Sequence, residues 1–314
     1  MEKERIIAAP STRQGNENMA KTVFDIVTEK VTELLDKGTI PWRKPWTGKD
    51  NIVKPVNVTG REYNGINYFL LSCLGYETPV FLTFKQIQDR GGKIKDGEEK
   101  KHFPVFFWAF NKYNKDAKGN ATEERTVPIC RYYLVWNIEQ TTCELPAKLK
   151  DQTVERVQNF GTIEAAETIV ANYENGPTIK VKDGSNRACY CPTTDIVSVP
   201  HKDQFTSLEE YYSTLFHELS HSTGHGSRLN RKEVVSPTFF GSHDYSVEEL
   251  VAEMGAAFLC NHAGIHNTLD NSAAYINGWL SKLKSDPKML MTAAGRAQKA
   301  FERIVGKKAT DVAE

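Results

Sequence analysis

The sequence contains no C-x-x-C pair, no long apolar run and no apolar leader, and each absence excludes a class of protein. Its six cysteines, at positions 73, 130, 143, 189, 191 and 260, lack the paired spacing of zinc ribbons and thiol redox motifs. We therefore expect reduced, structural thiols. No stretch approaches the roughly 18 apolar residues of a membrane-spanning helix. The polar N-terminus, MEKERIIAAPSTRQGNENMA, lacks the apolar centre of a signal peptide, which predicts a cytoplasmic protein.

Net charge is also missing, but the two halves of the chain differ in sign. The 40 Lys/Arg and 40 Asp/Glu residues of the whole chain cancel. Residues 20–150 carry 21 Lys/Arg against 16 Asp/Glu, whereas residues 151–314 carry 16 against 21. A basic half joined to an acidic half is a mild indication that the first half binds a polyanion.

The composition is that of an ordinary globular protein, with 39% hydrophobic and 25% charged residues. A length of 314 residues indicates about two domains. We predict a flexible N-terminus over 1–19, a first domain over 20–147, a second domain over 153–306 and a flexible tail over 307–314. The linker is expected around ELPAKLKDQ, residues 144–152.

The spacing of apolar residues predicts an α+β protein whose second half is mostly helical. In the first half we expect a helix over 22–37, a short helix capped by Thr83, and aromatic-rich strands over 102–110 and 129–138. Between the two strands, residues 111–126 are expected to form a polar hairpin loop or an insertion. In the second half we expect helices over 161–175, 211–225 and 247–264, a further helical region from 273 to about 305, and a small sheet from strands within 178–184 and 186–200.

The segment FHELSHSTGH contains the pattern His-Glu-x-x-His, formed by His217, Glu218 and His221. Residues four apart lie on one face of a helix, so both imidazoles can reach one ion. Glu218 then lies beside the ion, where it can act as general base for a bound water. The pattern predicts a zinc hydrolase, with Mn²⁺ as an alternative ion.

A catalytic zinc needs a third protein ligand. The metzincin spacing would place a histidine at position 227, where this sequence has Ser227, so that subclass is excluded. The downstream segment VEELVAE offers Glu248, Glu249 and Glu253 on an otherwise apolar helix. We predict Glu249 as the ligand and Glu253, one turn later, as the carboxylate that orients a ligand histidine, with the reverse assignment as the alternative.

Four further residues near the motif are weaker candidates. His243 and Tyr245 precede the glutamate helix and are candidates to stabilise an oxyanion. His225 follows the helix-breaking Gly224, which disfavours it as a metal ligand. Arg228 is expected either to pair with an acidic group near the site or to hold substrate.

Aromatic and cationic residues alternate early in the first half. The segment IPWRKPW contains Trp42, Arg43, Lys44 and Trp46, and the segment GREYNGINYFLL adds Arg61, Tyr63, Asn64, Asn67 and Tyr68. Exposed rings stack on bases while cations follow phosphates, so this composition suits single-stranded nucleic acid. The same rings could equally form the core of a small α+β domain.

Taken together, the motifs resemble those of ArdC-type antirestriction proteins. The resemblance rests on PWRKPW, N-x-T-G-x-x-Y-x-G-x-N and LTFKQ in the first half, and on F-H-E-L-x-H-x-T-G-H-x-x-R-L-x-R and Y-x-x-E-E-L-V-A-E in the second. It implies a DNA-binding N-terminal domain, in which Lys85 of LTFKQ is a further candidate contact, and a zincin-like metallopeptidase domain. It also implies a protein of a conjugative element that protects incoming DNA from restriction.

The resemblance leaves three functions open. The first is a zinc peptidase that a single-strand-binding domain brings to DNA, where it cleaves an unidentified protein substrate. The second is a DNA-binding protein that protects by occupancy and carries a vestigial protease domain. The third is an SprT-like protease that removes proteins crosslinked to DNA. The intact Glu218 favours a working hydrolase over a vestigial site, whereas a two-metal nuclease would need a richer carboxylate cluster.

Overall fold

The computed structural model describes residues 22–38, 40, 54–72, 74, 76–115, 121–150, 161–182, 187–236, 243–265 and 273–306. The predicted termini, 1–19 and 307–314, lie outside the described residues, as do Trp42, Arg43, Lys44 and Trp46. No helix of the described chain has the length and hydropathy needed to cross a membrane.

The first half of the chain combines helices with a mostly antiparallel sheet, as the apolar spacing predicted. The sheet has the order β1-β2-β4-β3; β1 pairs with β2 in parallel, and the other pairs are antiparallel. The elements are α1 (Val23–Asp36), β1 (Val56–Asn57), α2 (Gly65–Ser72), β2 (Val80–Thr83), α3 (Phe84–Asp89), β3 (Phe103–Lys115), β4 (Ala121–Asn137), η2 (Ile138–Gln140) and α4 (Ala147–Lys150).

Local signals fix the two helix starts that the sequence predicted here. Thr22 caps α1, because its side-chain oxygen accepts from the Asp25 amide while the Asp25 carboxylate accepts from the Thr22 amide. Thr83 forms the same reciprocal pair with Gln86 at the start of α3.

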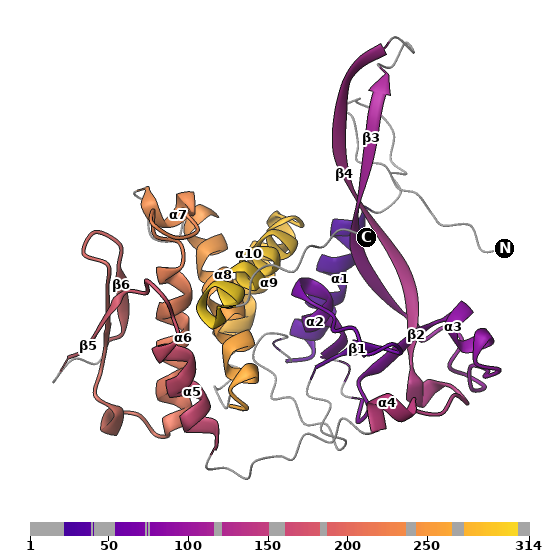
Figure 1. The fold of residues 1–314 in the computed structure, drawn as a ribbon, viewed down its shortest axis with the longest axis horizontal. Helices are drawn as coiled ribbons and strands as arrows, with labels where there is room; N and C mark the ends of the chain where they lie inside the picture. Colours follow the sequence, from indigo (N-terminus) through magenta and orange to yellow (C-terminus); the bar gives the residue numbers. More distant parts are fainter. Residues whose placement is uncertain are drawn as a thin grey trace.

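The segment 111–126 belongs to a hairpin, one of the two outcomes expected for it, but the strands are longer than predicted. It is not simply a polar loop, because β3 continues to Lys115 and β4 begins at Ala121. The paired strands form a long twisted hairpin that extends well away from the rest of the molecule (Figure 1). Backbone pairing along an antiparallel ladder is independent of side-chain polarity, so the polar composition concealed this extension.

The second half is mostly helical around a small sheet with the order β5-β7-β6. Its elements are α5 (Gly161–Ala171), β5 (Thr178–Val181), β6 (Cys189–Cys191), β7 (Ile196–Val199), η3 (Lys202–Gln204), α6 (Leu208–Ser222), α7 (Lys232–Val235), α8 (His243–His262), α9 (Ala273–Ser285) and α10 (Met289–Val305). The region predicted as one helical stretch from 273 is two helices, which are separated at Asp286–Lys288 by Pro287.

One continuous hydrophobic core joins the two halves. It contains Val27 of α1 and Phe69 of α2 together with Phe216 of α6, Leu250 of α8 and Leu290 of α10, each fully buried. In Figure 1, α1 and α2 lie between the sheet and the C-terminal helices; α2 contacts α10, and α1 contacts α9 and α10. The four-stranded sheet adds two smaller clusters around Val80 and Phe81.

Candidate metal centre

Helix α6 positions the His-Glu-x-x-His pattern. Ser207 caps the helix by accepting from the Glu210 amide, so α6 begins at Leu208, three residues before the predicted start. One side of the helix is buried, through the side chains of Tyr212, Phe216 and Leu219. The two histidines face α8 from neighbouring turns. The His217 side chain is 21% exposed and the His221 side chain is 14% exposed.

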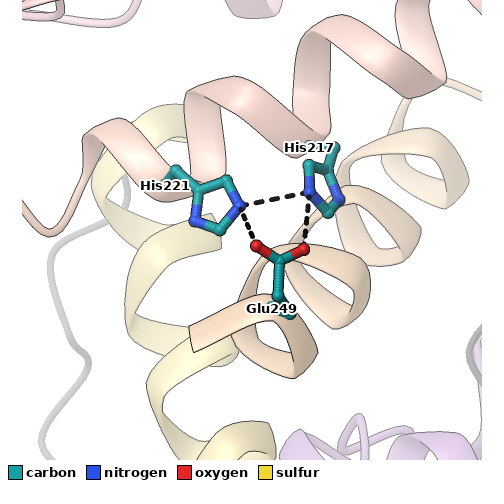
Figure 2. Close-up of side chains that lie close together, drawn as sticks. All are labelled: His217, His221 and Glu249. Carbon is teal, nitrogen blue, oxygen red and sulfur yellow. Dashed lines mark hydrogen bonds and ion pairs between the residues drawn. The ribbon is translucent and has the colours of Figure 1, made fainter. Parts of the chain in front are cut away.

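Helix α8 lies close enough to α6 to bring a carboxylate to both imidazoles. The closest approach is at Gly255, where an added Cβ would lie 2.5 Å from the Ser220 Oγ. Glu249 points into the space between the two histidines (Figure 2). Its Oε2 lies 3.6 Å from the His217 Nε2, and its Oε1 lies 3.6 Å from the His221 Nε2.

The three groups have the geometry of ligands to one ion. The two Nε2 atoms are 3.1 Å apart, and all three donor atoms lie within 4.8 Å of one another. Tetrahedral ligands at ~2.1 Å from a zinc ion would be about 3.4 Å apart, close to these separations. Two imidazoles and one carboxylate are a donor set that catalytic zinc accepts, so these residues fit a divalent metal.

The charges of the site depend on one another. Burial raises the pKa of Glu249, but the hydrogen bond and positive charge of His217 and the charge of His221 outweigh it and lower that pKa to about 2. Burial lowers the pKa of His217, but Glu249, Glu253 and Glu218 outweigh it and raise it to about 9. His217 and Glu249 thus each favour the charged form of the other.

Glu248 contacts the ligand His221. Its Oε1 lies 3.1 Å from the His221 Nδ1, the ring nitrogen on the side away from Glu249. Arg231 holds the same carboxylate, with Nη2 at 2.7 Å from Oε1 and Nε at 2.8 Å from Oε2. Both residues are buried: Glu248 is 5% exposed and Arg231 is 6% exposed. From the sequence we predicted Glu253 for the orienting of a ligand histidine, and its charge helps to raise the pKa of His217; Glu248 and Arg231 were not predicted for such a role.

Two signals in the sequence pointed to this pair. Glu248 lies on a helix that is apolar nearly all round, and a buried carboxylate needs a charged partner. Arg231 ends the segment RLNR that follows the histidines, and it also donates to the Thr223 Oγ1 at 2.6 Å and to the Ser220 carbonyl at 2.9 Å. Arg231 therefore ties the end of α6 to α8.

The remaining candidates near the motif have distinct places. Tyr245 lies at the site: burial, the charge of Glu249 and a hydrogen bond to it raise the tyrosine pKa to about 12. His243 instead contacts Asp286, with the Nε2 at 2.9 Å from Oδ2, and its side chain is 55% exposed. His225 contacts the Ser227 Oγ at 2.8 Å and is not part of the three-residue cluster.

Arg228 pairs with an acidic group, one of the two outcomes expected for it. Its guanidinium donates to both oxygens of Asp195, and its Nε donates to the Ser222 carbonyl at 2.8 Å. The Arg228 side chain is only 1% exposed. It therefore joins the turn between β6 and β7 to the end of α6.

The candidate DNA contacts divide into buried and exposed residues. Tyr63 and Tyr68 are 8% and 2% exposed, which corrects the expectation that their rings stack on bases. The Asn67 amide is used internally, because it donates to the Phe106 carbonyl at 2.6 Å and accepts from the Phe106 amide at 2.8 Å. The exposed candidates are Arg61, Asn64 and Lys85.

Three exposed rings, Phe107, Trp108 and Tyr133, lie on the hairpin, and a fourth, Phe84, lies at the start of α3. Phe107 and Tyr133 are each 38% exposed, and their ring centroids are 5.8 Å apart. Arg131 is the cross-strand partner of Phe107, and the charge of Arg61 reaches Tyr133. We call Arg61, Phe107, Arg131 and Tyr133 the strand platform. The alternation of side chains along a strand predicted that about half of these rings would face outward, but not which half.

Comparisons with known proteins agree with this architecture. The family described as the N-terminal domain of anti-restriction factor ArdC matches residues 21–136, and a zincin-like metallopeptidase family matches residues 164–296. The metal-free crystal structure of the antirestriction ArdC protein from plasmid R388 is 30% identical in sequence and gives a TM-score of 0.71. The similarity covers 91% of this chain and 97% of that one. This chain belongs to the ArdC family.

The ArdC homologue also resembles a second R388 structure and several curated proteins. The Mn(II)-bound R388 ArdC structure is 30% identical, with a TM-score of 0.70 over 93% of this chain and 100% of that one. Two proteins named DNA primase TraC, from Escherichia coli, are 34% and 35% identical over 93% and 91% of this chain. The uncharacterized protein y4eC of Sinorhizobium fredii is 28% identical over 88% of this chain and 89% of its own length.

The chain spans only 20% and 27% of the length of the two TraC proteins. The ArdC family membership therefore rests on the R388 structures, which it matches over nearly their whole length. The zincin-like domain implies Zn²⁺, and the Mn(II)-bound R388 structure agrees with Mn²⁺ as an alternative ion.

Proposed function

We propose that this ArdC homologue is a metal-dependent peptidase that binds single-stranded DNA and protects DNA entering a cell from restriction. The observation that carries the proposal is the triangle of His217, His221 and Glu249, with the buried Glu218 beside it. Family membership supports the antirestriction role.

The residues around the triangle have separate tasks in peptide hydrolysis. A Zn²⁺ or Mn²⁺ ion, when bound, supplies the Lewis acidity that polarises a water and a peptide carbonyl. Glu218, which is 9% exposed, takes the proton of the attacking water and passes it to the leaving amine. Glu248 and Arg231 fix the His221 ring so that its Nε2 faces the ion.

Tyr245 is the proposed oxyanion donor. Its pKa is raised to about 12, chiefly by burial and further by the negative charges of the nearby Glu249 and Glu218. The phenol therefore keeps its proton at neutral pH and can donate a hydrogen bond to a developing oxyanion. For His243, the contact with Asp286 favours a role in joining α8 to the start of α10.

The strand platform is the proposed surface for single-stranded DNA. Two exposed rings at stacking distance can accept bases, and each stacked base contributes about 1–3 kcal/mol. Arg61 and Arg131 provide positive charge for the phosphates. Tyr63, although buried, supports the platform, because its hydroxyl is hydrogen-bonded to Tyr133.

The decisive experiment compares wild type with Glu218→Gln for protection of conjugatively transferred DNA in a restricting recipient, at matched protein levels. The variant keeps the metal ligands and the strand platform, so its metal content and its affinity for single-stranded DNA should equal those of wild type. We expect it to lose protection. Glu174→Gln, at an exposed position, is the matched control.

Full protection by Glu218→Gln would contradict the peptidase part of the proposal. It would favour protection by occupancy, in which DNA binding alone is enough. A variant of the strand platform, Phe107→Ala with Tyr133→Ala, tests the other part: it should lose affinity for single-stranded DNA while its metal content stays at one ion per chain.

A further inference from the structure

A cavity of about 510 Å³ lies between the two halves of the molecule, away from the metal centre. The segment before α2 forms one wall, and the C-terminal parts of α8 and α10 form the others. Its size is in the range of small-molecule sites. The lining residues that matter here are Glu62, Asn64, Tyr68, Phe258, Asn261 and Phe301.

The deepest polar group of the cavity is the side chain of Asn261. This residue is only 6% exposed, and its Nδ2 finds no hydrogen-bond partner within the described part of the chain. Buried amide groups are nearly always hydrogen-bonded, since leaving a donor without a partner is costly. A ligand that enters beside Asn261 and carries an acceptor can satisfy this donor once the side chain turns toward the cavity that it lines.

The walls around this donor are aromatic. Phe258 and Phe301 are 6% and 4% exposed, and their ring centroids are 5.9 Å apart. The ring of Tyr68 lies 5.0 Å from that of Phe258. Flat rings of this kind favour a flat, partly apolar ligand that also has polar edges.

The charges at the rim exclude an anion from the interior. Glu62 pairs with Lys54 at 3.2 Å, which leaves the nearby Glu302 carboxylate, itself bonded to the Gln298 amide at 2.8 Å, as excess negative charge. The negative charge of this carboxylate would repel a phosphate but not an uncharged heterocycle. The cavity chemistry thus selects a neutral planar ring with hydrogen-bond acceptors.

The cavity adjoins the strand platform through one residue. Tyr63 lines the cavity, and its hydroxyl is hydrogen-bonded to Tyr133 of the platform. Arg61 of the platform is two residues from Tyr63, and the exposed Asn64 lies at the cavity rim. These residues place one wall of the cavity next to the strand platform.

We propose that the cavity receives one unstacked base of single-stranded DNA, which accepts a hydrogen bond from Asn261 and packs against Phe258 and Phe301. The sugar and phosphate stay outside the cavity, toward Arg61 of the strand platform and away from Glu302. This inference rests on the proposed binding of single-stranded DNA and adds the site at which a base, rather than the backbone, is held.

The test measures the affinity of the intact, metal-loaded protein for two fluorescent oligonucleotides of equal length and charge: a single-stranded thymidine oligomer and its fully abasic counterpart. The variant is Asn261→Leu, which fills a similar volume and removes the donor. Lys299→Ala, an exposed change on α10, is the control. Metal content and the melting temperature confirm that each variant is folded.

Wild type and Lys299→Ala should prefer the thymidine oligomer, and Asn261→Leu should weaken binding to it by about tenfold, the effect of one lost hydrogen bond to a base. Binding of the abasic oligomer should not change. An unchanged preference in Asn261→Leu, or equal weakening with both oligomers, would overturn the inference and leave the proposed function standing. If wild type binds neither oligomer, the DNA-binding part of the proposed function fails as well.

Should Asn261→Leu lower the metal content or the melting temperature, a second variant at the rim keeps the test decisive. Asn64→Trp places a large side chain at the exposed mouth without touching the buried walls. It should reduce the preference for the thymidine oligomer by about tenfold, as Asn261→Leu does, and a preference equal to that of wild type would overturn the proposal.

Discussion

At the scale of single residues, the candidate metal centre includes Glu248, a carboxylate that contacts a ligand histidine and is not itself one of the three ligands. Glu248 fixes the His221 ring from behind, and Arg231 fixes Glu248. Substituting Glu248 by Gln keeps the shape but weakens both contacts. We expect about 10–100-fold weaker metal binding, as for other residues that orient a metal-binding histidine.

Metal affinity, measured by competition with a chromophoric chelator, checks this prediction. Glu253→Gln is measured beside it, because Glu253 is the carboxylate that the sequence predicted to orient a ligand histidine. A greater loss of affinity in Glu253→Gln than in Glu248→Gln would restore the assignment made from the sequence.

The pair Asp195–Arg228 makes a prediction about pH. The hydrogen bond from Arg228, against the opposing effect of burial, lowers the pKa of Asp195 in the folded state. A carboxyl with a lowered folded pKa adds stability above its unfolded pKa of about 3.9, and that stability is lost as the pH falls through the folded value. Asp195→Asn should cost about 1–3 kcal/mol at pH 7. The cost should be the same at pH 5 and should shrink below pH 4, as measured by urea unfolding.

The residues named from the sequence alone fared differently in the two halves. His217, His221 and Glu249 come together because helical periodicity and burial determine both of their helices. Tyr63 and Tyr68 resemble DNA-binding residues in composition, yet they are core residues. Composition reports which rings are present, but the exposure of a ring depends on which neighbours cover it.

At the scale of elements, the approach of α6 and α8 determines whether three ligands can meet. An added Cβ at Gly255 would lie 2.9 Å from the Ser220 Cβ, closer than real contacts allow. Gly255→Ala should therefore force the helices apart, cost about 1–3 kcal/mol and weaken metal binding.

Gly295→Ala on α10 is the matched control, because an added Cβ there meets nothing within 4 Å. The control should be neutral or stabilise by up to about 1 kcal/mol, since alanine favours helix. Combining Gly255→Ala with Ser220→Gly should cost less than the sum of the two single changes. Additive costs in thermal unfolding would contradict direct contact as the cause.

The elements themselves were largely predictable, and the exceptions have physical reasons. Helix α1 and the start of α3 follow from capping pairs that are visible in the sequence. The continuation of the β3–β4 hairpin through polar residues was not predictable, because its pairing is between backbones. The contact of α2 with α10 joins distant parts of the chain, and no local pattern encodes it.

At the scale of the whole molecule, α1 and α2 share a core with the C-terminal helices. Val27 of α1 is fully buried in that core. Val27→Ala should lower the free energy of unfolding by about 1–3 kcal/mol. Because the core is shared, the protection of α8 and α10 against opening should fall as much as that of α1. Hydrogen exchange at α8 amides checks this, with Lys30→Ala on the exposed side of α1 as control. Faster exchange confined to α1 would show that the halves unfold independently.

Helix α8 carries Glu249 near its start and Asn261 near its end, twelve residues and about 18 Å apart. One continuous helix therefore borders both the metal centre and the cavity that we assign to a base. Free energies of binding at two such sites obey reciprocity. Whatever factor a bound strand applies to the affinity for the ion, the ion must apply the same factor to the affinity for the strand. If that factor differs from one, a cell that withholds the metal shifts the proposed DNA affinity of this protein by the same factor.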